Sequence, residues 1–186
     1  AVTGCSQSAA PTKQGEGTPA GQPAGDSGGQ ADPAARLKLN LKTEPPSLDP
    51  PKGFDSTSNE VLNATMEGLA RLDKDHKPQP AMAEKWSVSE DGKTYTFTLR
   101  DSKWSNGDPV TAQDFEFAFK RIVDPNNAFP SAFLAYYIEG AEEFNKGTGT
   151  ADGVKVKAVD EKTLEVHLKA PAGFFLHIIT QPTFFP

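Results

Sequence analysis

The chain has 186 residues and a formal net charge of −6, with a sequence pI near 5.1. This length can bury the core of one or two domains. The excess of acidic residues argues against a nucleic-acid partner, because binding to phosphates needs clustered Lys and Arg. No apolar run approaches the roughly 18–20 residues that a membrane-spanning helix requires. The single cysteine excludes a disulfide within the chain.

That cysteine, Cys5, follows Val-Thr-Gly at positions 2–4. The pattern is similar to a bacterial lipobox, in which small residues precede a cysteine that becomes diacylated and N-terminal. An unremarkable cysteine near a frayed terminus is the alternative. Because the chain begins with Ala and lacks the charged and apolar regions of a signal peptide, residues 1–5 are expected to be the end of a lipoprotein signal sequence.

Residues 6–35 are expected to form a disordered tether. They contain no Val, Ile, Leu, Met, Phe, Trp or Tyr, and Gly, Pro, Ala, Ser, Thr and Gln dominate. Such a stretch buries too little apolar surface to offset the entropy lost on ordering. Its root-mean-square reach is roughly 30 Å.

A short strand and a proline-rich loop are predicted to open the folded part, within residues 36–56. Three leucines alternate with polar residues, the period of a strand with one buried face: Leu37, Leu39 and Leu41. The strand is expected to stop at residues 43–50, Thr-Glu-Pro-Pro-Ser-Leu-Asp-Pro, because proline cannot donate to a continuing ladder. We refer to residues 43–50 as the proline-rich loop.

A helix and two extended pieces follow. Thr57 and Glu60 match a capping box at the start of this helix. Five residues are expected on one helical face: Val61, Leu62, Thr65, Met66 and Leu69. Residues 69–72 and 78–86 are predicted to be extended pieces on either side of a charged turn.

The next pattern is a strand between two tight turns. Apolar residues alternate with threonines, as in a half-buried strand: Tyr95, Phe97 and Leu99. Asp91-Gly92 before this strand and Asn106-Gly107 after it supply the positive φ that tight turns need. Trp86 and Trp104, which lie beside this region, are expected in the core.

A second helix is predicted over residues 111–123. Thr111 and Asp114 match a capping box in which Asp replaces the usual Glu. Four apolar residues form a one-sided stripe: Phe115, Ala118, Phe119 and Ile122. Asp124-Pro125 is expected to end the helix. Residues 129–137 follow, Phe-Pro-Ser-Ala-Phe-Leu-Ala-Tyr-Tyr, which we call the aromatic loop.

The last predicted element is a hairpin. Alternating apolar residues at 154–158 and 164–168 flank an Asp-Glu-Lys turn. Residues 174–186 are strongly apolar for a chain end, and they are expected to need a partner surface outside the chain. These elements, without any repeat, predict a fold of the α+β or mixed α/β class.

The order of the pieces from Trp86 to Phe115 (strand, Asp-Gly turn, strand, Asn-Gly turn, capped helix) resembles the family 5 solute-binding proteins of bacterial ABC transporters, the oligopeptide- and dipeptide-binding lipoproteins. The resemblance implies a periplasmic-binding-protein type II-like fold. Residues 36–56 would be the first strand and cleft loop of lobe one, 57–172 an inserted α+β subdomain, and 173–186 the start of a return into lobe one. Family members are much longer, so the chain is expected to be an amino-terminal fragment with a partial first lobe.

The sequence offers no catalytic constellation. The histidines at positions 76, 167 and 177 lack the spacing of a metal site, and His167 is expected to face solvent from a strand. Glu142-Glu143 and Glu90-Asp91 are adjacent in sequence, whereas an acid–base couple needs carboxylates that converge in a cleft. We therefore expect no enzyme, no cofactor and no metal. A surface lipoprotein enzyme that acts on the cell wall stays as the distant alternative.

Ligand-contact residues follow from the resemblance. Relatives carry an acidic residue near the amino end of a bound peptide in the loop after the first strand, and Glu44, beside Pro45, occupies that place. A carboxylate there would form a charge-assisted hydrogen bond with the peptide ammonium; a surface glutamate beside a proline turn is the alternative. Relatives also place a tyrosine of the aromatic loop against the peptide. Tyr136 is the best match, and a slip in alignment would make it Phe133 or Tyr137; core packing is the alternative use of these rings.

The resemblance implies the amino-terminal part of a monomeric peptide-binding receptor for an ABC-type oligopeptide importer. Its partners would be a peptide ligand, the membrane permease subunits and a lipid anchor at Cys5. The receptor would lie outside the cytoplasm on the membrane surface. Dipeptides, nickel chelates, glutathione or oligosaccharides are alternative cargoes on similar scaffolds, and a truncated reading frame without function is a further alternative.

Overall fold

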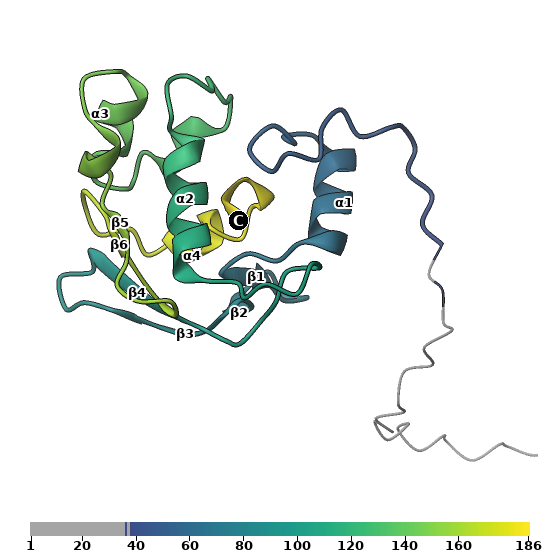
Figure 1. The fold of residues 1–186 in the computed structure, drawn as a ribbon, viewed down its shortest axis with the longest axis horizontal. Helices are drawn as coiled ribbons and strands as arrows, with labels where there is room; N and C mark the ends of the chain where they lie inside the picture. Colours follow the sequence, from purple (N-terminus) through teal and green to yellow (C-terminus); the bar gives the residue numbers. More distant parts are fainter. Residues whose placement is uncertain (1–35, 37) are drawn as a thin grey trace, which may run out of the picture. The chain divides into compact units, whose positions relative to one another are not determined.

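The computed structural model describes residues 36 and 38–186. The predictions for Cys5 and for the tether therefore lie outside the described residues. Residues 40–186 form one compact unit, drawn in Figure 1. Its helices are α1 (Ser56–Thr65), α2 (Ala112–Ile122), α3 (Ala141–Asn145) and α4 (Phe175–Ile178). Its strands are β1 (Ala70–Leu72), β2 (Pro78–Pro80), β3 (Ala83–Val88), β4 (Thr94–Leu99), β5 (Val156–Ala158) and β6 (Thr163–His167). Short 3₁₀ helices span Ala132–Ala135, Ala151–Gly153 and Pro182–Phe184.

The main sheet has four antiparallel strands in the order β3-β4-β6-β5. The period-two pattern of β4 buries Tyr95, Phe97 and Leu99 and leaves the threonines half-buried. Gly92 has a φ of 70° in the turn between β3 and β4. The predicted strand and the predicted β5–β6 hairpin are confirmed. The two extended pieces around the charged turn form a separate hairpin of β1 and β2.

Helix α2 packs on this sheet against β5 and β6. The capping box predicted at its start is present, with the Thr111 N–H donating to Asp114 Oδ2 over 2.8 Å. The predicted stripe is buried as a set: Phe115, Ala118, Phe119 and Ile122. Trp86 and Trp104 are partly buried and pack against this core. An antiparallel sheet covered by a helix is the α+β arrangement that the sequence predicts.

Two details of the amino-terminal part differ from the predictions. Residues 38–41 carry no strand and Leu39 is 66% exposed, so the alternating leucines do not form one in the described part of the chain. Helix α1 is capped by Asp55 rather than by Thr57, because Asp55 Oδ1 accepts from the Ser58 N–H over 2.9 Å. The helix ends at Thr65 and Met66 is extended, so the five predicted residues do not share one helical face.

Most of the apolar residues near the chain end are buried within the chain itself, which corrects the prediction that they need a partner surface outside it. Phe175, Ile179, Phe184 and Phe185 all belong to the core. This segment, yellow in Figure 1, lies between α1 and α2. Gly68 makes room for it, since a Cβ there would lie 2.5 Å from Phe185 Cε1. The subdomain boundaries at 56/57 and 172/173 stay predictions.

Candidate functional site

The proline-rich loop leads into a compact turn. Ser47 Oγ accepts from the Asp49 N–H over 3.1 Å. The Asp49 carbonyl accepts from the N–H groups of Lys52 and Gly53, both over 2.9 Å. Gly53 is buried where the turn meets α1. Local bonds therefore give the Asp49 end of the loop a defined shape.

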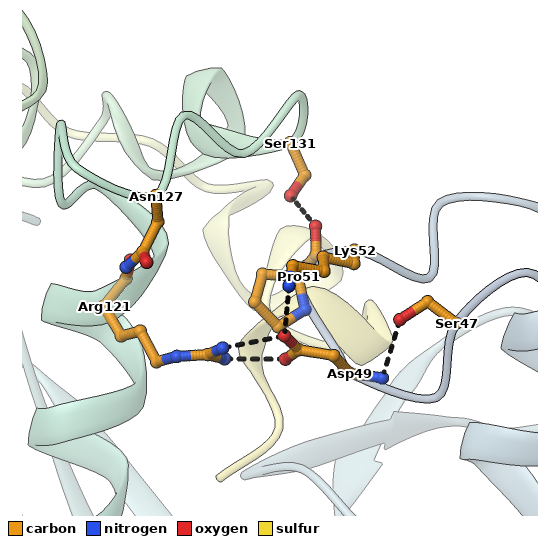
Figure 2. A network of polar contacts seen from close by, with 7 residues as sticks. All are labelled: Ser47, Asp49, Pro51, Lys52, Arg121, Asn127 and Ser131. Carbon is orange, nitrogen blue, oxygen red and sulfur yellow. Dashed lines mark hydrogen bonds and ion pairs between the residues drawn. The ribbon is translucent and has the colours of Figure 1, made fainter.

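Figure 2 shows a paired contact between this turn and α2. Nη1 and Nη2 of the Arg121 guanidinium donate to Oδ1 and Oδ2 of Asp49, each over 2.7 Å. Lys52 Nζ lies 3.5 Å from the same carboxylate. The hydrogen bond from Arg121 lowers the pKa of the Asp49 carboxyl, and partial burial opposes this only in part. The bidentate geometry makes this one of the stronger kinds of ion pair.

The aromatic loop is joined to the same turn. The buried Ser131 hydroxyl donates to the Pro51 carbonyl over 2.9 Å, as Figure 2 shows. The guanidinium of Arg121 lies 5.0 Å from the centre of the Phe129 ring. The ring of Phe133 meets that of Phe54 edge-on at 6.5 Å. The two segments that the sequence singles out are thus neighbours in space.

The predicted contact residues differ in what they offer a ligand. Glu44 is exposed and forms no hydrogen bond or ion pair within residues 38–186, and Pro45 is half-buried. Phe133 is 53% exposed and Tyr137 is 42% exposed. The Tyr136 hydroxyl instead donates to Asn145 Oδ1 over 2.6 Å. Of the three aromatic candidates, the structure therefore leaves Phe133 and Tyr137 more accessible than Tyr136.

Phe54 and Phe174, whose rings meet those of Phe133 and Tyr137 edge-on, line a shallow hollow of about 290 Å³. Its lining comes from the residue before the Asp55 cap of α1, from the aromatic loop, and from α4 with its flanking residues: Phe54, Leu134, Phe174, His177, Ile178 and Gln181. Phe174 meets Tyr137 edge-on at 5.1 Å. The aromatic loop thus continues into the surface beside α4. This hollow is mainly apolar, with an imidazole and an amide at its edge.

The acidic pairs have structural partners. Glu142 accepts hydrogen bonds from Lys146 and Lys169, and these bonds lower its pKa to about 2. Asp91 accepts from the Ser89 hydroxyl and the Lys93 N–H within the turn before β4. Such contacts suit a surface ion pair and a turn. His167 is about 43% exposed, as expected of a solvent-facing strand residue.

In the described part of the chain, no group of three or more His, Cys, Asp and Glu side chains is placed to hold a metal ion. Within the same residues, no helix has both the length and the apolar character that crossing a membrane requires.

Comparison with known proteins identifies the family. Residues 77–186 match the family described as "Bacterial extracellular solute-binding proteins, family 5 Middle". The dipeptide-binding protein DppE of Bacillus subtilis is 58% identical over 151 residues, and the oligopeptide-binding protein OppA of the same organism is 52% identical over 151 residues. The chain belongs to the family 5 bacterial extracellular solute-binding proteins. Each match covers 81% of the chain and 28% of the relative, so the chain spans about 28% of the length of these relatives.

Solved structures of similar proteins agree with this assignment. The substrate-binding domain of an oligopeptide ABC transporter from Bacillus anthracis has a TM-score of 0.77 at 48% identity, covering 80% of this chain and 29% of that one. OppA of Listeria monocytogenes, described as bound to peptide, has a TM-score of 0.74 at 42% identity. That match covers 76% of this chain and 28% of the OppA chain. The predicted periplasmic-binding-protein type II-like fold is therefore confirmed. Family 5 proteins are solute-binding proteins rather than an enzyme family.

Sequence reasoning missed the residues that join the two loops of this family 5 chain: Asp49, Phe54, Arg121 and Ser131. Asp49 and Arg121 lie 72 positions apart, and no spacing rule links them. Arg121 itself gave a weak indication of a structural contact, because it is a cation in the last turn of a helix and its neighbour Ile122 is fully buried. Its carboxylate partner required the fold.

Proposed function

We propose that the chain forms the first part of a receptor that captures peptides outside the cytoplasm and delivers them to an ABC-type importer. The observation that carries this proposal is the 58% and 52% identity to a dipeptide-binding and an oligopeptide-binding protein. The likeness to a family member described as bound to peptide supports the same cargo. Because the chain spans 28% of those relatives, the activity belongs to a complete receptor rather than to this segment alone.

The proposed capture uses a charged group and an apolar surface. The exposed Glu44 carboxylate binds the peptide ammonium through a charge-assisted hydrogen bond. Pro45 supports this role, because it restricts the backbone of the preceding residue, Glu44, to extended conformations. Phe133 and Tyr137 supply rigid contact area. Tyr136, fixed by Asn145, holds the aromatic loop in shape and contributes its ring edge.

The receptor binds peptides of varied sequence, because main-chain hydrogen bonds to an extended peptide supply the affinity. The receptor closes around its ligand by a hinge motion and presents it to the permease subunits. It acts as a monomer, without a cofactor and without catalytic turnover. A lipid anchor on Cys5 holds it at the outer face of the cell membrane, since an acyl chain adds about 0.8 kcal/mol per buried CH₂.

A chimera tests the proposal. Residues 36–186 replace the matching 151-residue segment of B. subtilis DppE, and isothermal titration calorimetry measures binding of short peptides with free or acetylated amino ends. We expect binding that acetylation weakens. Glu44→Gln weakens it by about tenfold or more, because a hydrogen bond to a charged group contributes about 1.5–3 kcal/mol.

The matched control is Glu60→Gln, another exposed glutamate, which lies on α1 and leaves the affinity unchanged. A chimera that folds and binds no peptide, under conditions in which DppE does, refutes the proposal. The chain by itself is expected to bind peptide weakly or not at all, and a micromolar dissociation constant for it would contradict the need for a complete receptor.

A further inference from the structure

We infer that Arg121 is a positioning residue that holds the proline-rich loop and the aromatic loop at one fixed spacing. Its consequence for ligand capture rests on the proposed function above, while the spacing itself does not. Arg121 lies in α2, between the two candidate contact segments, and belongs to neither.

Arg121 touches both segments at once. Its guanidinium forms the two 2.7 Å bonds to Asp49, the residue before the last proline of the proline-rich loop. The same group lies over the ring of Phe129, the first residue of the aromatic loop, at 5.0 Å. The Arg121 carbonyl also accepts from Asn127 Nδ2 over 3.4 Å, close to where the aromatic loop begins. One side chain thus links segments that are far apart in sequence.

The base of this side chain is rigid. Arg121 lies in the last turn of α2, and its neighbours Phe119 and Ile122 are fully buried against the core. Phe119 in turn packs on Phe184 with ring centres 5.0 Å apart. A long side chain is held more firmly when its backbone cannot move and its planar head is clamped on two sides. Both conditions hold for Arg121.

Arginine is suited to this place in a way that lysine is not. A planar fork matches both carboxylate oxygens and stacks on an aromatic face, whereas an ammonium is a point charge. Lys52 illustrates the difference, since its Nζ lies 3.5 Å from Asp49 and 6.0 Å from the Phe129 ring centre while its side chain stays 58% exposed. Both Lys52 and Arg121 therefore place a positive charge near Asp49, but the bidentate hydrogen bonds come from Arg121.

Two other contacts lie at the ends of the proline-rich loop, one just beyond the loop and one at an exposed position. Ser131 binds the Pro51 carbonyl, beyond the loop. The Thr43 and Thr57 hydroxyls lie 3.2 Å apart at an exposed position. Between these ends, Glu44 approaches the Asp49 anchor through two consecutive prolines, which limit bending. Removal of the Arg121 fork should therefore loosen the stretch that carries Glu44, and a peptide would then have to order it on binding.

The test measures backbone order in the whole chain by ¹⁵N NMR relaxation. In the unsubstituted chain we expect an order parameter of about 0.85 for the Leu48 amide, and a value below about 0.6 in Arg121→Met. Arg121→Lys, which keeps the charge and loses the fork, is expected to resemble Arg121→Met. The Phe119 amide in α2 stays rigid in every variant, which separates lost positioning from general unfolding.

Arg100→Met is the matched control, because Arg100 also pairs with a carboxylate, that of Glu67, and contacts neither loop. It should leave the order of the Leu48 amide unchanged. A rigid Leu48 amide in Arg121→Met would overturn the inference. An equal loss of order in Arg100→Met would also overturn it.

The consequence for binding is measured in the DppE chimera. Arg121→Met should raise the peptide dissociation constant about tenfold, although Arg121 need not touch the ligand. An unchanged dissociation constant would overturn the role in capture. If the unsubstituted chimera binds no peptide, the proposed function fails, and the order parameters still decide whether Arg121 fixes the spacing.

Discussion

Replacement of Phe175 by alanine should destabilise the chain far more than the same change at its neighbour Phe174. Phe175 is fully buried, and its ring centre lies 5.1 Å from that of Tyr95. The Tyr95 hydroxyl donates to the Ala172 carbonyl over 3.1 Å, so Tyr95 holds both the start of α4 and the segment before it on the sheet. Phe174 is 50% exposed and meets Tyr137 edge-on.

The magnitudes follow from these environments. A buried Phe→Ala change costs about 3–5 kcal/mol, including the cavity that it leaves. For Phe174 about half of the roughly 1.5–3 kcal/mol for burial of a large apolar side chain is at stake, so the loss is about 1 kcal/mol. A domain with about 5–15 kcal/mol of stability tolerates the loss at Phe174, whereas the loss at Phe175 takes up most of the stability at the lower end of that range.

Urea unfolding followed by far-ultraviolet circular dichroism gives both free energies. Phe175→Leu serves as a milder variant if Phe175→Ala does not fold. Equal losses at the two positions, or a loss below about 1 kcal/mol for Phe175→Ala, would refute the conclusion that the residues near the chain end complete the core of this chain.

Three further predictions concern single residues. Ala128 has a φ of 47°, so Ala128→Gly should raise the free energy of unfolding by about 0.5–1 kcal/mol, whereas the control Ala64→Gly in α1 should lower it by about 1 kcal/mol; thermal and urea unfolding measure both. Asp114→Ala removes the capping box and should cost about 1 kcal/mol in the same assay, while Gln113→Ala, exposed on the same turn, should cost little; equal effects would contradict the cap. The pKa of Glu142 is lowered from 4.5 to about 2, so its ion pairs stabilise the fold fully above pH 4.5 and lose this effect as the pH falls toward 2. Carboxyl NMR titration should find its midpoint near 2, and Glu142→Gln should weaken the dependence of stability on pH in that range.

Patterns that depend on neighbouring residues could be predicted from the sequence. The threonine-laced strand β4 and the capped helix α2 follow from period and capping chemistry, which act within a few residues. The prediction of the α1 cap was wrong because it took the Thr57–Glu60 pattern, whereas Asp55, two positions earlier, caps the helix through the Ser58 N–H. A capping pattern in the sequence therefore indicates that a helix begins nearby, and the structure shows which residue caps it.

Contacts between distant segments could not be predicted in the same way. The chain end was expected to need another surface, because nothing in the sequence showed that Gly68 leaves room for Phe185. Asp49 and Arg121 lie 72 positions apart, and the sequence around each residue does not indicate its partner. The candidate contact residues came from the family resemblance, and the residues that hold those candidates in place came from the structure.

The proline-rich loop lies outside the family match at residues 77–186, whereas α2 and the aromatic loop lie inside it. The proline-rich loop contacts the matched part through Asp49 to Arg121 and, one residue beyond the loop, through Pro51 to the buried Ser131. A bidentate ion pair and a buried hydrogen bond resist shear between the two loops, since each loses its geometry when the partners slide. If the proposed receptor closes by a hinge, Glu44 and Phe133 should then move as one body, and the hinge should lie outside the two loops.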